Sequence, residues 1–365
     1  MMQVLILESS FERELKEGKQ EGFASILGYS FQQYIVNACV EAKLSIVTDK
    51  DDMQDDILVL SSSVPMINDQ TLIHVIEDEN DLYLGQQGSV VAYKAKKEEL
   101  IDISWDMTFE ASLEKLVHNQ DRKVSSLSHL LVVENLVDLF LTQNKVAEEI
   151  CYSWMRKGVR IEKPKETFIS PYAKIGEGTW IQGSLLLEGK SEVGKNCLFI
   201  GACEVYDTKI GDGVVVKSSV LESSVMEDGS DIGPYSHLRP KSHVGKNVHL
   251  GNFVELKKAS MGEGSKAGHL AYIGDAEVGK NVNISCGVIF CNYDGKKKHK
   301  TMVGDHAFIG SNVNLVAPLE VEEEAYIGAG STITKKVEKG ALAVERSEQK
   351  LILGYVDKQK RSEEK

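Results

Sequence analysis

The chain has 365 residues, a length that favours two or three domains. With 42% hydrophobic and 27% charged residues, it has the composition of a folded globular protein and not of a disordered one. Its formal net charge of −13 excludes a basic footprint for nucleic acid or an anionic membrane at the level of the whole chain. No apolar stretch approaches the roughly 18 residues that a membrane span needs, so we expect no membrane insertion.

The first residues and the cysteines indicate a cytoplasmic protein. Residues 1–8 have no basic region, and their apolar run stops at Glu8, which predicts a first β-strand and not a signal peptide. The cysteines form no CxxC pair and no zinc spacing, so we expect reduced thiols. There are six of them: Cys39, Cys151, Cys197, Cys203, Cys286 and Cys291.

The pattern up to residue 165 predicts a reduced, Rossmann-like α/β domain. Apolar runs predict strands at Gln3–Leu7, 57–60 and 90–93, and helical spacing predicts helices near 31–42, 132–141 and 146–157. Gly158 closes the last helix, and Pro164 and Pro171 introduce the next part of the chain. No Walker-type loop and no dinucleotide GxGxxG motif follows a strand.

Residues 166–365 hold 25 of the 31 glycines and carry a repeat with a period of six. Eighteen apolar residues in three registers define it, and many are followed by glycine. They are Ile169, Ile175, Ile181, Leu187, Val193, Phe199 and Val205; Ile232, Leu238, Val244, Leu250 and Leu256; and Val303, Ile309, Leu315, Val321, Ile327 and Ile333.

A period of six matches neither a helix nor a simple strand alternation, but it suits a short strand plus a turn. Three such units make one triangular coil with its aliphatic side chains stacked inside. The alternative is an ordinary β-sandwich, whose turns recur at larger spacings, about 8–12 residues. We therefore predict an all-β left-handed parallel β-helix of about nine coils over 169–333.

The register is interrupted between Phe290 and Val303, which stand thirteen residues apart. The intervening polar segment, residues 291–300, cannot continue the apolar stack, so we expect an extruded loop. Its five consecutive basic-type side chains, residues 296–300, favour an anion site on this acidic chain, and the alternative is a solvated loop.

Three histidines also stand six apart, at His237, His243 and His249. Residues with this spacing lie on successive sides of a triangular coil and cannot converge on one ion. We therefore predict no metal site there.

Several long segments of the second part resemble one enzyme family. They are IGPYSHLRP, GNFVELKKA, GSKAGHLAYIGDAEVGKNVNI, CNYDGKKKHKT, GSNVNLVAP, IGAGSTIT and AVERSEQ, all within residues 232–346. They resemble the acetyltransferase domain of the bacterial bifunctional N-acetylglucosamine-1-phosphate uridylyltransferase/glucosamine-1-phosphate N-acetyltransferase. Residues 144–231 resemble its connecting helix and first coils more loosely, and residues 1–143 resemble its nucleotidyltransferase domain only in fragments.

The resemblance implies roles for individual residues and an assembly. His269, in the segment AGHLAY, corresponds to the catalytic base. The amino-sugar phosphate site corresponds to Arg239, Lys257, Tyr272, Asn283 and Lys298. The contacts with acetyl-CoA, the co-substrate, correspond to Cys286, Asn292, Tyr293, Ser311, Ala329 and Arg346, and Cys286 stands where the family often has a small residue. The family is a homotrimer with sites between neighbouring β-helices.

The residue types agree with this chemistry independently. Acetyl transfer needs a neutral amine, and histidine is the base that titrates near neutral pH. Arg239 and Lys257 supply fixed cations for a phosphate, arginine through a bidentate fork. On spacing alone, a single histidine in a β-helix is more often a surface residue, so the surrounding segments favour catalysis at His269.

The N-terminal part lacks three features that the resemblance implies for uridylyl transfer. Glu8, Glu12 and Glu14 follow the first strand with no glycine before Gly18, and we expect these carboxylates to repel a triphosphate. Ser63 stands where the family has a magnesium-binding Asp, and a hydroxyl cannot balance Mg²⁺ as a carboxylate does. The Gly-Tyr-Gly sugar-binding segment has no counterpart. We expect uridylyl transfer to be lost and Mg²⁺ not to bind there.

The function expected from the sequence is acetyl-CoA-dependent N-acetylation of glucosamine 1-phosphate, in the supply of UDP-N-acetylglucosamine for the cell envelope. The alternatives are an acetyltransferase for another amino sugar and a non-catalytic regulator or scaffold. The expected domains are a degenerate nucleotidyltransferase-like domain at 1–143, a linker helix and connection at 144–165, the β-helix acetyltransferase domain at 166–337, and a charged tail at 338–365.

Overall fold

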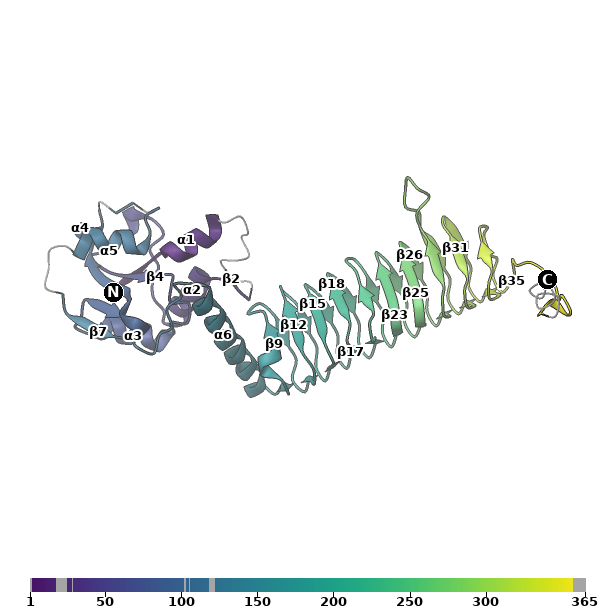
Figure 1. Cartoon of the computed structure of the whole chain (residues 1–365), viewed down its shortest axis with the longest axis horizontal. Coiled ribbons are helices and arrows are strands. Elements are labelled where there is room, and N and C mark those ends of the chain that lie inside the picture. Colours follow the sequence, from purple (N-terminus) through teal and green to yellow (C-terminus); the bar gives the residue numbers. More distant parts are fainter. Residues whose placement is uncertain are drawn as a thin grey trace, which may run out of the picture. The chain divides into compact units, whose positions relative to one another are not determined.

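The structure is a computed structural model that describes residues 2–17, 25–27, 29–101, 103–104, 106–117 and 122–356. The chain divides into two compact units, residues 1–191 and residues 192–365, and Figure 1 traces both. Gly18 and residues 357–365 of the predicted tail lie outside the described residues. None of the described helices is long and apolar enough to cross a membrane.

Unit 1 contains a five-stranded mixed sheet in the order β1-β4-β6-β5-β7. Strands β1 and β4 are parallel, β6 is antiparallel to β4 and β5, and β5 is parallel to β7. The three predicted strands of this part are therefore confirmed. The strands are β1 (Gln3–Leu7), β4 (Asp56–Ser61), β5 (Leu82–Leu84), β6 (Val90–Lys96) and β7 (Val124–Ser126).

Helices cover both faces of this sheet, because side chains along β1 alternate between two cores. Val4 packs in one core with the apolar faces of α2 and α3, and its neighbour Leu5 packs in the other with Phe109 of α5. The helices before α6 are α1 (Ser10–Glu17), α2 (Phe31–Glu41), α3 (Asp69–Glu77), α4 (Lys97–Leu100) and α5 (Phe109–Val117), and a small hairpin joins β2 (Ser25–Ile26) to β3 (Tyr29–Ser30).

One helix, α6 (Leu136–Arg156), replaces the two that the sequence predicts around residues 132–157. The polar residues between the two apolar stretches contain no glycine or proline, so nothing interrupts the helix. It begins at Asn135, whose side chain accepts from the N–H groups of Val137 and Asp138, and it ends just before Gly158, where φ is +88°. The predicted boundary at residue 143 falls inside this helix and stays a prediction.

Parallel coils follow α6. Strand β8 pairs with β11 and β9 pairs with β12, both in parallel. The coil strands of unit 1 are β8 (Arg160–Ile161), β9 (Thr167–Ile169), β10 (Lys174–Ile175), β11 (Trp180–Ile181) and β12 (Leu185–Glu188).

Unit 2 is built from three columns of short parallel strands, which confirms the predicted parallel β-helix. The first column holds β13 (Glu192–Val193), β16 (Lys209–Ile210), β19 (Val225–Met226), β22 (His243–Val244), β24 (Ser260–Met261), β26 (Ala276–Val278), β29 (Thr301–Val303) and β32 (Leu319–Val321). The second holds β14 (Leu198–Ile200), β17 (Val215–Lys217), β20 (Asp231–Ile232), β27 (Asn283–Ile284), β30 (Phe308–Ile309), β33 (Tyr326–Ile327) and β35 (Leu342–Ala343). The third holds β15 (Cys203–Tyr206), β18 (Val220–Glu222), β21 (His237–Leu238), β28 (Ile289–Cys291), β31 (Asn314–Val316) and β34 (Thr332–Ile333).

Two longer strands, β23 (His249–Lys257) and β25 (Lys266–Gly274), run through the corner between the second and third columns. They pair with each other in parallel over most of their length. The predicted aliphatic stack is confirmed, because every one of its eighteen residues is at most 7% exposed.

Candidate functional site

One corner of the β-helix collects residues from successive coils. Asn252 on β23 is the register partner of His269 on β25. The following coils are stacked on this turn in the same way, through one backbone hydrogen bond between each pair of neighbouring coils. These bonds run from Gly287 N to Leu270 O, from Asn312 N to Cys286 O and from Gly330 N to Ser311 O. We call the set Asn252, His269, Cys286, Ser311 and Ala329 the corner column; β23 and β25 mark its start in Figure 1.

His269 lies near the start of this column with its imidazole exposed. Its Nδ1 lies 2.7 Å from the Oδ1 atom of Asn252 on the preceding coil. Because an amide oxygen only accepts, Nδ1 carries the proton and donates it. In the neutral imidazole this leaves the lone pair on Nε2, the atom with which a general base accepts a proton.

Four of the six residues expected to contact acetyl-CoA lie along or beside this column. Cys286, Ser311 and Ala329 occupy the corner on the coils that follow His269. Arg346 lies beyond the last coil strand and donates from Nη1 to the backbone oxygen of Ala329 at 3.0 Å. Cys286 is a free, half-buried thiol. The corner thus offers a line of backbone groups and small side chains beside the imidazole.

Three cations form a second feature, which we call the cationic cluster: Arg239, Lys257 and Lys298. The backbone N–H of Arg239 donates to Leu256 O, which brings Arg239 next to Lys257 on the adjacent coil. Contact with Lys298, together with the charges of Arg239 and Lys298, lowers the pKa of Lys257. Among the described residues, Arg239 is the member of the cluster that forms an ion pair, with Glu255 at 2.9 Å. The charge of Asp275 offsets part of the effect on Lys257. Like charges gathered in this way favour binding of an anion that relieves their repulsion.

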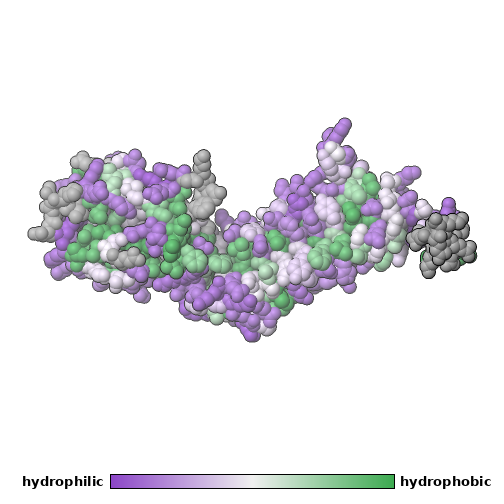
Figure 2. Space-filling model, in the orientation of Figure 1, coloured by the Kyte–Doolittle hydropathy of each residue, from purple (hydrophilic) through white to green (hydrophobic). Residues whose placement is uncertain are grey.

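Lys298 reaches the cluster from the loop between β28 and β29, which is extruded as predicted and projects from the β-helix in Figure 1. An antiparallel bridge joins Tyr293 to Lys298, and Asp294 accepts the N–H groups of Lys296 and Lys297 at 2.7 and 2.6 Å. Figure 2 shows the projection as hydrophilic. Of its basic side chains, His299 pairs with Asp294, and Lys300 pairs with a glutamate of β26.

Tyr272 and Asn292 link the loop to the coils. The amide nitrogen of Asn292 donates to Asp275 at 2.6 Å and to the Tyr272 hydroxyl at 3.4 Å. Both side chains cover Gly274, where an added Cβ would lie 2.5 Å from the tyrosine hydroxyl, so only glycine leaves room for this contact. Asn283 lies apart on β27, where it donates to Ser285 at 3.0 Å. No hydrogen bond of the described residues joins it to the cationic cluster.

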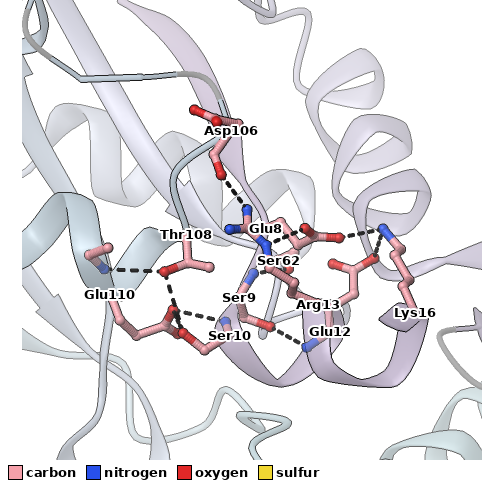
Figure 3. Close-up of polar contacts among 11 residues, drawn as sticks. Glu8, Ser9, Ser10, Glu12, Arg13, Lys16, Ser62, Asp106, Thr108 and Glu110 are labelled. Atoms are coloured by element: carbon pink, nitrogen blue, oxygen red, sulfur yellow. Dashed lines mark hydrogen bonds and ion pairs between the residues drawn. The ribbon is translucent and has the colours of Figure 1, made fainter. Parts of the chain in front are cut away.

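In unit 1, the carboxyl end of β1 carries a polar cluster, shown in Figure 3. Glu8 pairs with Arg13 at 3.1 Å and with Lys16 at 2.6 Å, and the fully buried Glu12 also pairs with Lys16. Burial alone would raise the pKa of Glu8, but the contacts with Lys16 and Arg13 outweigh it and lower the pKa. Two cations of α1, Arg13 and Lys16, thus pair with Glu8 and Glu12, which the sequence alone did not show. The expected repulsion of a triphosphate stays a prediction.

Other groups at this strand end are also satisfied internally. Ser10, the first residue of α1, donates its N–H and its hydroxyl to Glu110 at 2.9 and 2.8 Å (Figure 3). The backbone N–H of Ser9 donates to the buried Ser62 hydroxyl at 2.8 Å. Ser63, which stands where the family has a magnesium-binding Asp, is buried, and its hydroxyl bonds to that of Ser61.

Several known proteins are similar in sequence to about two thirds of this chain. The bifunctional protein GlmU of Shouchella clausii is 48% identical over 236 residues, which cover 65% of this chain and 52% of that protein. This chain is similar to the bifunctional protein GlmU. The GlmU proteins of Clostridioides difficile, 45% identical over 240 residues, and of Thermodesulfovibrio yellowstonii, 44% identical over 235 residues, are matched in the same way. The chain spans about half the length of these GlmU relatives, 52% of each.

No protein-family model matches the chain. Among solved structures, the Arabidopsis UDP-N-acetylglucosamine acyltransferase is 16% identical with a TM-score of 0.44, covering 51% of this chain and 71% of that one. The Francisella novicida enzyme of the same name is also 16% identical, with a TM-score of 0.36 and coverage of 49% and 64%.

Sequence reasoning did not identify Asn252 or the cations Arg13 and Lys16. Asn252 becomes visible in the sequence only when the register of β23 against β25 is known. Arg13 and Lys16 both lie on α1, with Lys16 in its last turn, and the i, i+4 spacing of Glu12 and Lys16 was an available signal.

Proposed function

We propose that this chain transfers the acetyl group of acetyl-CoA to the amine of glucosamine 1-phosphate, as an N-acetyltransferase. The observation that carries the proposal is the arrangement of two groups on one strand, β25. An exposed imidazole with a free Nε2 lies at its corner, and Tyr272 and Gly274 at its end adjoin the cationic cluster. A substrate that carries both an amine and a phosphate could place the amine at the imidazole and the phosphate at the cationic cluster.

In this proposal, the cationic cluster binds the phosphate and so fixes the distance of the amine from the corner column. The neutral amine nitrogen attacks the thioester carbonyl carbon, and His269 Nε2 takes the proton that the nitrogen loses. The C–N bond forms, the C–S bond breaks, and coenzyme A leaves as a thiolate that then takes a proton. Cys286, Ser311, Ala329 and Arg346 line the path along which the extended arm of acetyl-CoA would lie, with Asn292 and Tyr293 beside it.

The proposal includes loss of uridylyl transfer. At the strand end where a nucleotide would bind, Glu110 already accepts the hydrogen bonds of Ser10, and Arg13 and Lys16 are engaged by Glu8 and Glu12. The donors and cations that could bind a triphosphate, those of Ser10, Arg13 and Lys16, are thus already paired with carboxylates of the protein. The buried Ser63 offers a hydroxyl and no carboxylate to Mg²⁺.

A homotrimer with sites shared between chains and a cytoplasmic location remain parts of the proposal. The exposed corner favours the trimer, since Tyr235 and Phe253 stack there with ring centroids 5.6 Å apart and side chains 65% and 52% exposed. Two further functions stay open as alternatives: acetylation of another amino sugar, and a non-catalytic scaffold. The scaffold gives no reason for the repulsive placement of Lys257 beside Lys298.

The deciding experiment measures thiol release from acetyl-CoA by the full-length protein. Glucosamine 1-phosphate is compared with glucosamine, glucosamine 6-phosphate and galactosamine 1-phosphate, and UTP-dependent pyrophosphate release is followed in parallel. We expect release with glucosamine 1-phosphate and little with the unphosphorylated sugar. Preference for another amino sugar selects the first alternative, and no release with any amine selects the scaffold.

A further inference from the structure

Four histidines of unit 2 lie on strands that the structure describes, and each contacts a side chain on the preceding coil. Three of them contact a carboxylate: His237 contacts Glu222 at 2.9 Å, His243 contacts Glu227 at 2.8 Å, and His249 contacts Asp231 at 2.8 Å. The fourth, His269, contacts a neutral amide, that of Asn252 at 2.7 Å. Among these four histidines, the one in the corner column is thus the one whose partner on the preceding coil is uncharged.

The backbone holds Asn252 and His269 in this contact. The preceding residues, Gly251 and Gly268, approach so closely that a Cβ on Gly251 would lie 1.7 Å from Gly268 O. The following residues, Phe253 and Leu270, have φ angles of +58° and +46°, a conformation that turns the strand at the corner. Two coils with the same unusual turn therefore present the amide and the imidazole side by side.

A neutral partner has a definite chemical consequence for a base. A carboxylate beside an imidazole stabilises its protonated form, so a smaller fraction of the rings is neutral and able to accept a proton at a given pH. An amide oxygen orients the ring through Nδ1–H and adds no such charge. It also selects the tautomer, because the proton on Nδ1 leaves the lone pair on Nε2.

We propose that Asn252 is a positioning residue of the acetyl-transfer site, which holds His269 as the uncharged Nδ1–H tautomer with Nε2 free to accept the proton of the substrate amine. This inference rests on the proposed function, in which His269 is the base. Asn252 acts through His269 and touches no reacting atom. Charged and titratable groups also lie on the elements packed around His269: His249, Glu255 and Lys257 on β23, Lys266 and Tyr272 on β25, and Cys286 on the following turn.

Two variants of the full-length protein test the proposal, Asn252→Ala and Asn252→Asp. We expect Asn252→Ala to lower kcat by about 10–100-fold, with KM for both substrates within several-fold, because the ring loses its orientation and its tautomer. We expect Asn252→Asp to keep the orientation and to move the acidic limb of the pH–rate profile upward by about one pH unit. The control is Glu227→Gln, which changes the carboxylate beside His243 away from the site and should leave kcat and the pH profile unchanged.

A readout that does not depend on activity is ¹⁵N NMR of the imidazole of His269, assigned with His269→Ala. We expect Nδ1 protonated and Nε2 unprotonated in the wild type at alkaline pH, and a shift toward the Nε2–H tautomer in Asn252→Ala. An Nε2–H tautomer in the wild type overturns the proposal. So does Asn252→Ala with wild-type kcat and tautomer, or Asn252→Asp with an unchanged acidic limb.

The experiments distinguish failure of the proposed acetyl transfer from failure of the positioning role of Asn252. If the wild type releases no thiol with any amino sugar while the NMR shows the Nδ1–H tautomer held by Asn252, the acetyl-transfer function fails and a structural contact remains. If the wild type is active and His269→Ala is inactive, unchanged Asn252 variants overturn only the positioning role.

Discussion

Glu110 accepts two hydrogen bonds from Ser10, one from its backbone N–H at 2.9 Å and one from its hydroxyl at 2.8 Å. Ser10 is the first residue of helix α1, and the N-terminus of a helix attracts negative charge. A side chain of the protein therefore takes the position in which a nucleotide phosphate would find its first backbone donors. A nucleotide would have to displace this carboxylate and also separate Arg13 and Lys16 from Glu8.

The first prediction concerns this strand end. We expect no UTP- and Mg²⁺-dependent pyrophosphate release by the full-length protein, and none after Glu110→Ala. Glu110→Ala removes the acceptor of two hydrogen bonds at the start of α1. This loss should lower the free energy of unfolding of the N-terminal domain by about 0.5–2 kcal/mol. Chemical denaturation measures the change, with Glu114→Ala, at an exposed position of α5, the helix that carries Glu110, as the control. Pyrophosphate release by the wild type at an ordinary enzymatic rate would contradict the predicted loss of uridylyl transfer.

The second prediction concerns the cationic cluster. We expect Lys257→Ala and Arg239→Ala to raise KM for glucosamine 1-phosphate by about 10–100-fold, since hydrogen bonds to charged groups contribute roughly 1.5–3 kcal/mol. KM for acetyl-CoA should change far less. Arg239→Lys should rescue only in part, because lysine lacks the planar fork.

Steady-state kinetics with each substrate varied in turn gives both constants. Lys258→Ala, the exposed neighbour in the chain, is the control and should behave as the wild type. Equal effects of Lys257→Ala on the two substrates would show that the cluster binds a different ligand from the one proposed.

The third prediction concerns His269. We expect His269→Ala to lower kcat by roughly 10²–10⁴-fold and to leave the affinity for both substrates within several-fold, because a base acts mainly in the transition state. Single-turnover kinetics with glucosamine 1-phosphate and binding titrations measure the two effects separately. Near wild-type turnover would mean that another group takes the proton.

The fourth prediction is a pH dependence of the loop between β28 and β29. The N–H of Lys297, then His299 and the N–H of Lys296, lower the pKa of Asp294 from 3.8 to about 2. A carboxylate whose pKa is lowered in the folded state stabilises that state above pH 4 or so, and this stabilisation is lost as the pH falls toward 2. We expect the amides of Lys296 and Lys297 to lose protection from hydrogen exchange over this range.

An NMR titration of the Asp294 carboxyl group checks the same point, and a midpoint at the ordinary value near 3.8 would show that the loop does not hold this carboxylate. Asp294→Asn should remove the pH dependence. It should also raise KM for the sugar phosphate modestly, because Lys298 is carried by the same hairpin.

The fifth prediction concerns removal of the N-terminal domain. A chain that begins at Asn135 keeps the cap of α6, and we expect it to retain most of the acetyl transfer, since every proposed site residue lies between 239 and 346. Solubility should fall, because the deletion uncovers Leu139 and Val146, which pack against Phe31. Thiol release by the purified truncated protein measures the outcome. A folded truncated protein with no release would assign the N-terminal domain a part in acetyl transfer.

The coil register was predictable from sequence because the apolar period of six is itself the core. Ile232, Leu250 and Ile309, for example, point inward for the same reason that they recur. The continuity of α6 was not predictable from periodicity, because the apolar stripe weakens near residue 143 while helix-forming residues continue. The contact of Asn252 with His269 depends on pairing between coils whose spacing departs from six, as Leu256 and Met261 do, so counting alone does not align them.

The pairing of Glu8 and Glu12 with Arg13 and Lys16 shows a second limit. From the charges read one by one along the sequence, we predicted only that three carboxylates repel a triphosphate, whereas helix α1 brings Arg13 and Lys16 next to Glu8 and Glu12. The cationic cluster was predicted from resemblance, but the mutual effect of Lys257 and Lys298 required the path of the loop in space.

The coils of unit 2 contact only their neighbours, so a β-helix of this kind melts from its ends. The last coil strand, β35, pairs with β33 and precedes Arg346, whereas Arg239 and Lys257 lie several coils deeper. Gentle heating should therefore first release the end of the β-helix that holds two of the proposed cofactor contacts, Ala329 and Arg346, while the coils with Arg239 and Lys257 stay intact. If the proposed function holds, gentle heating should weaken the affinity for acetyl-CoA before it affects the affinity for the sugar phosphate.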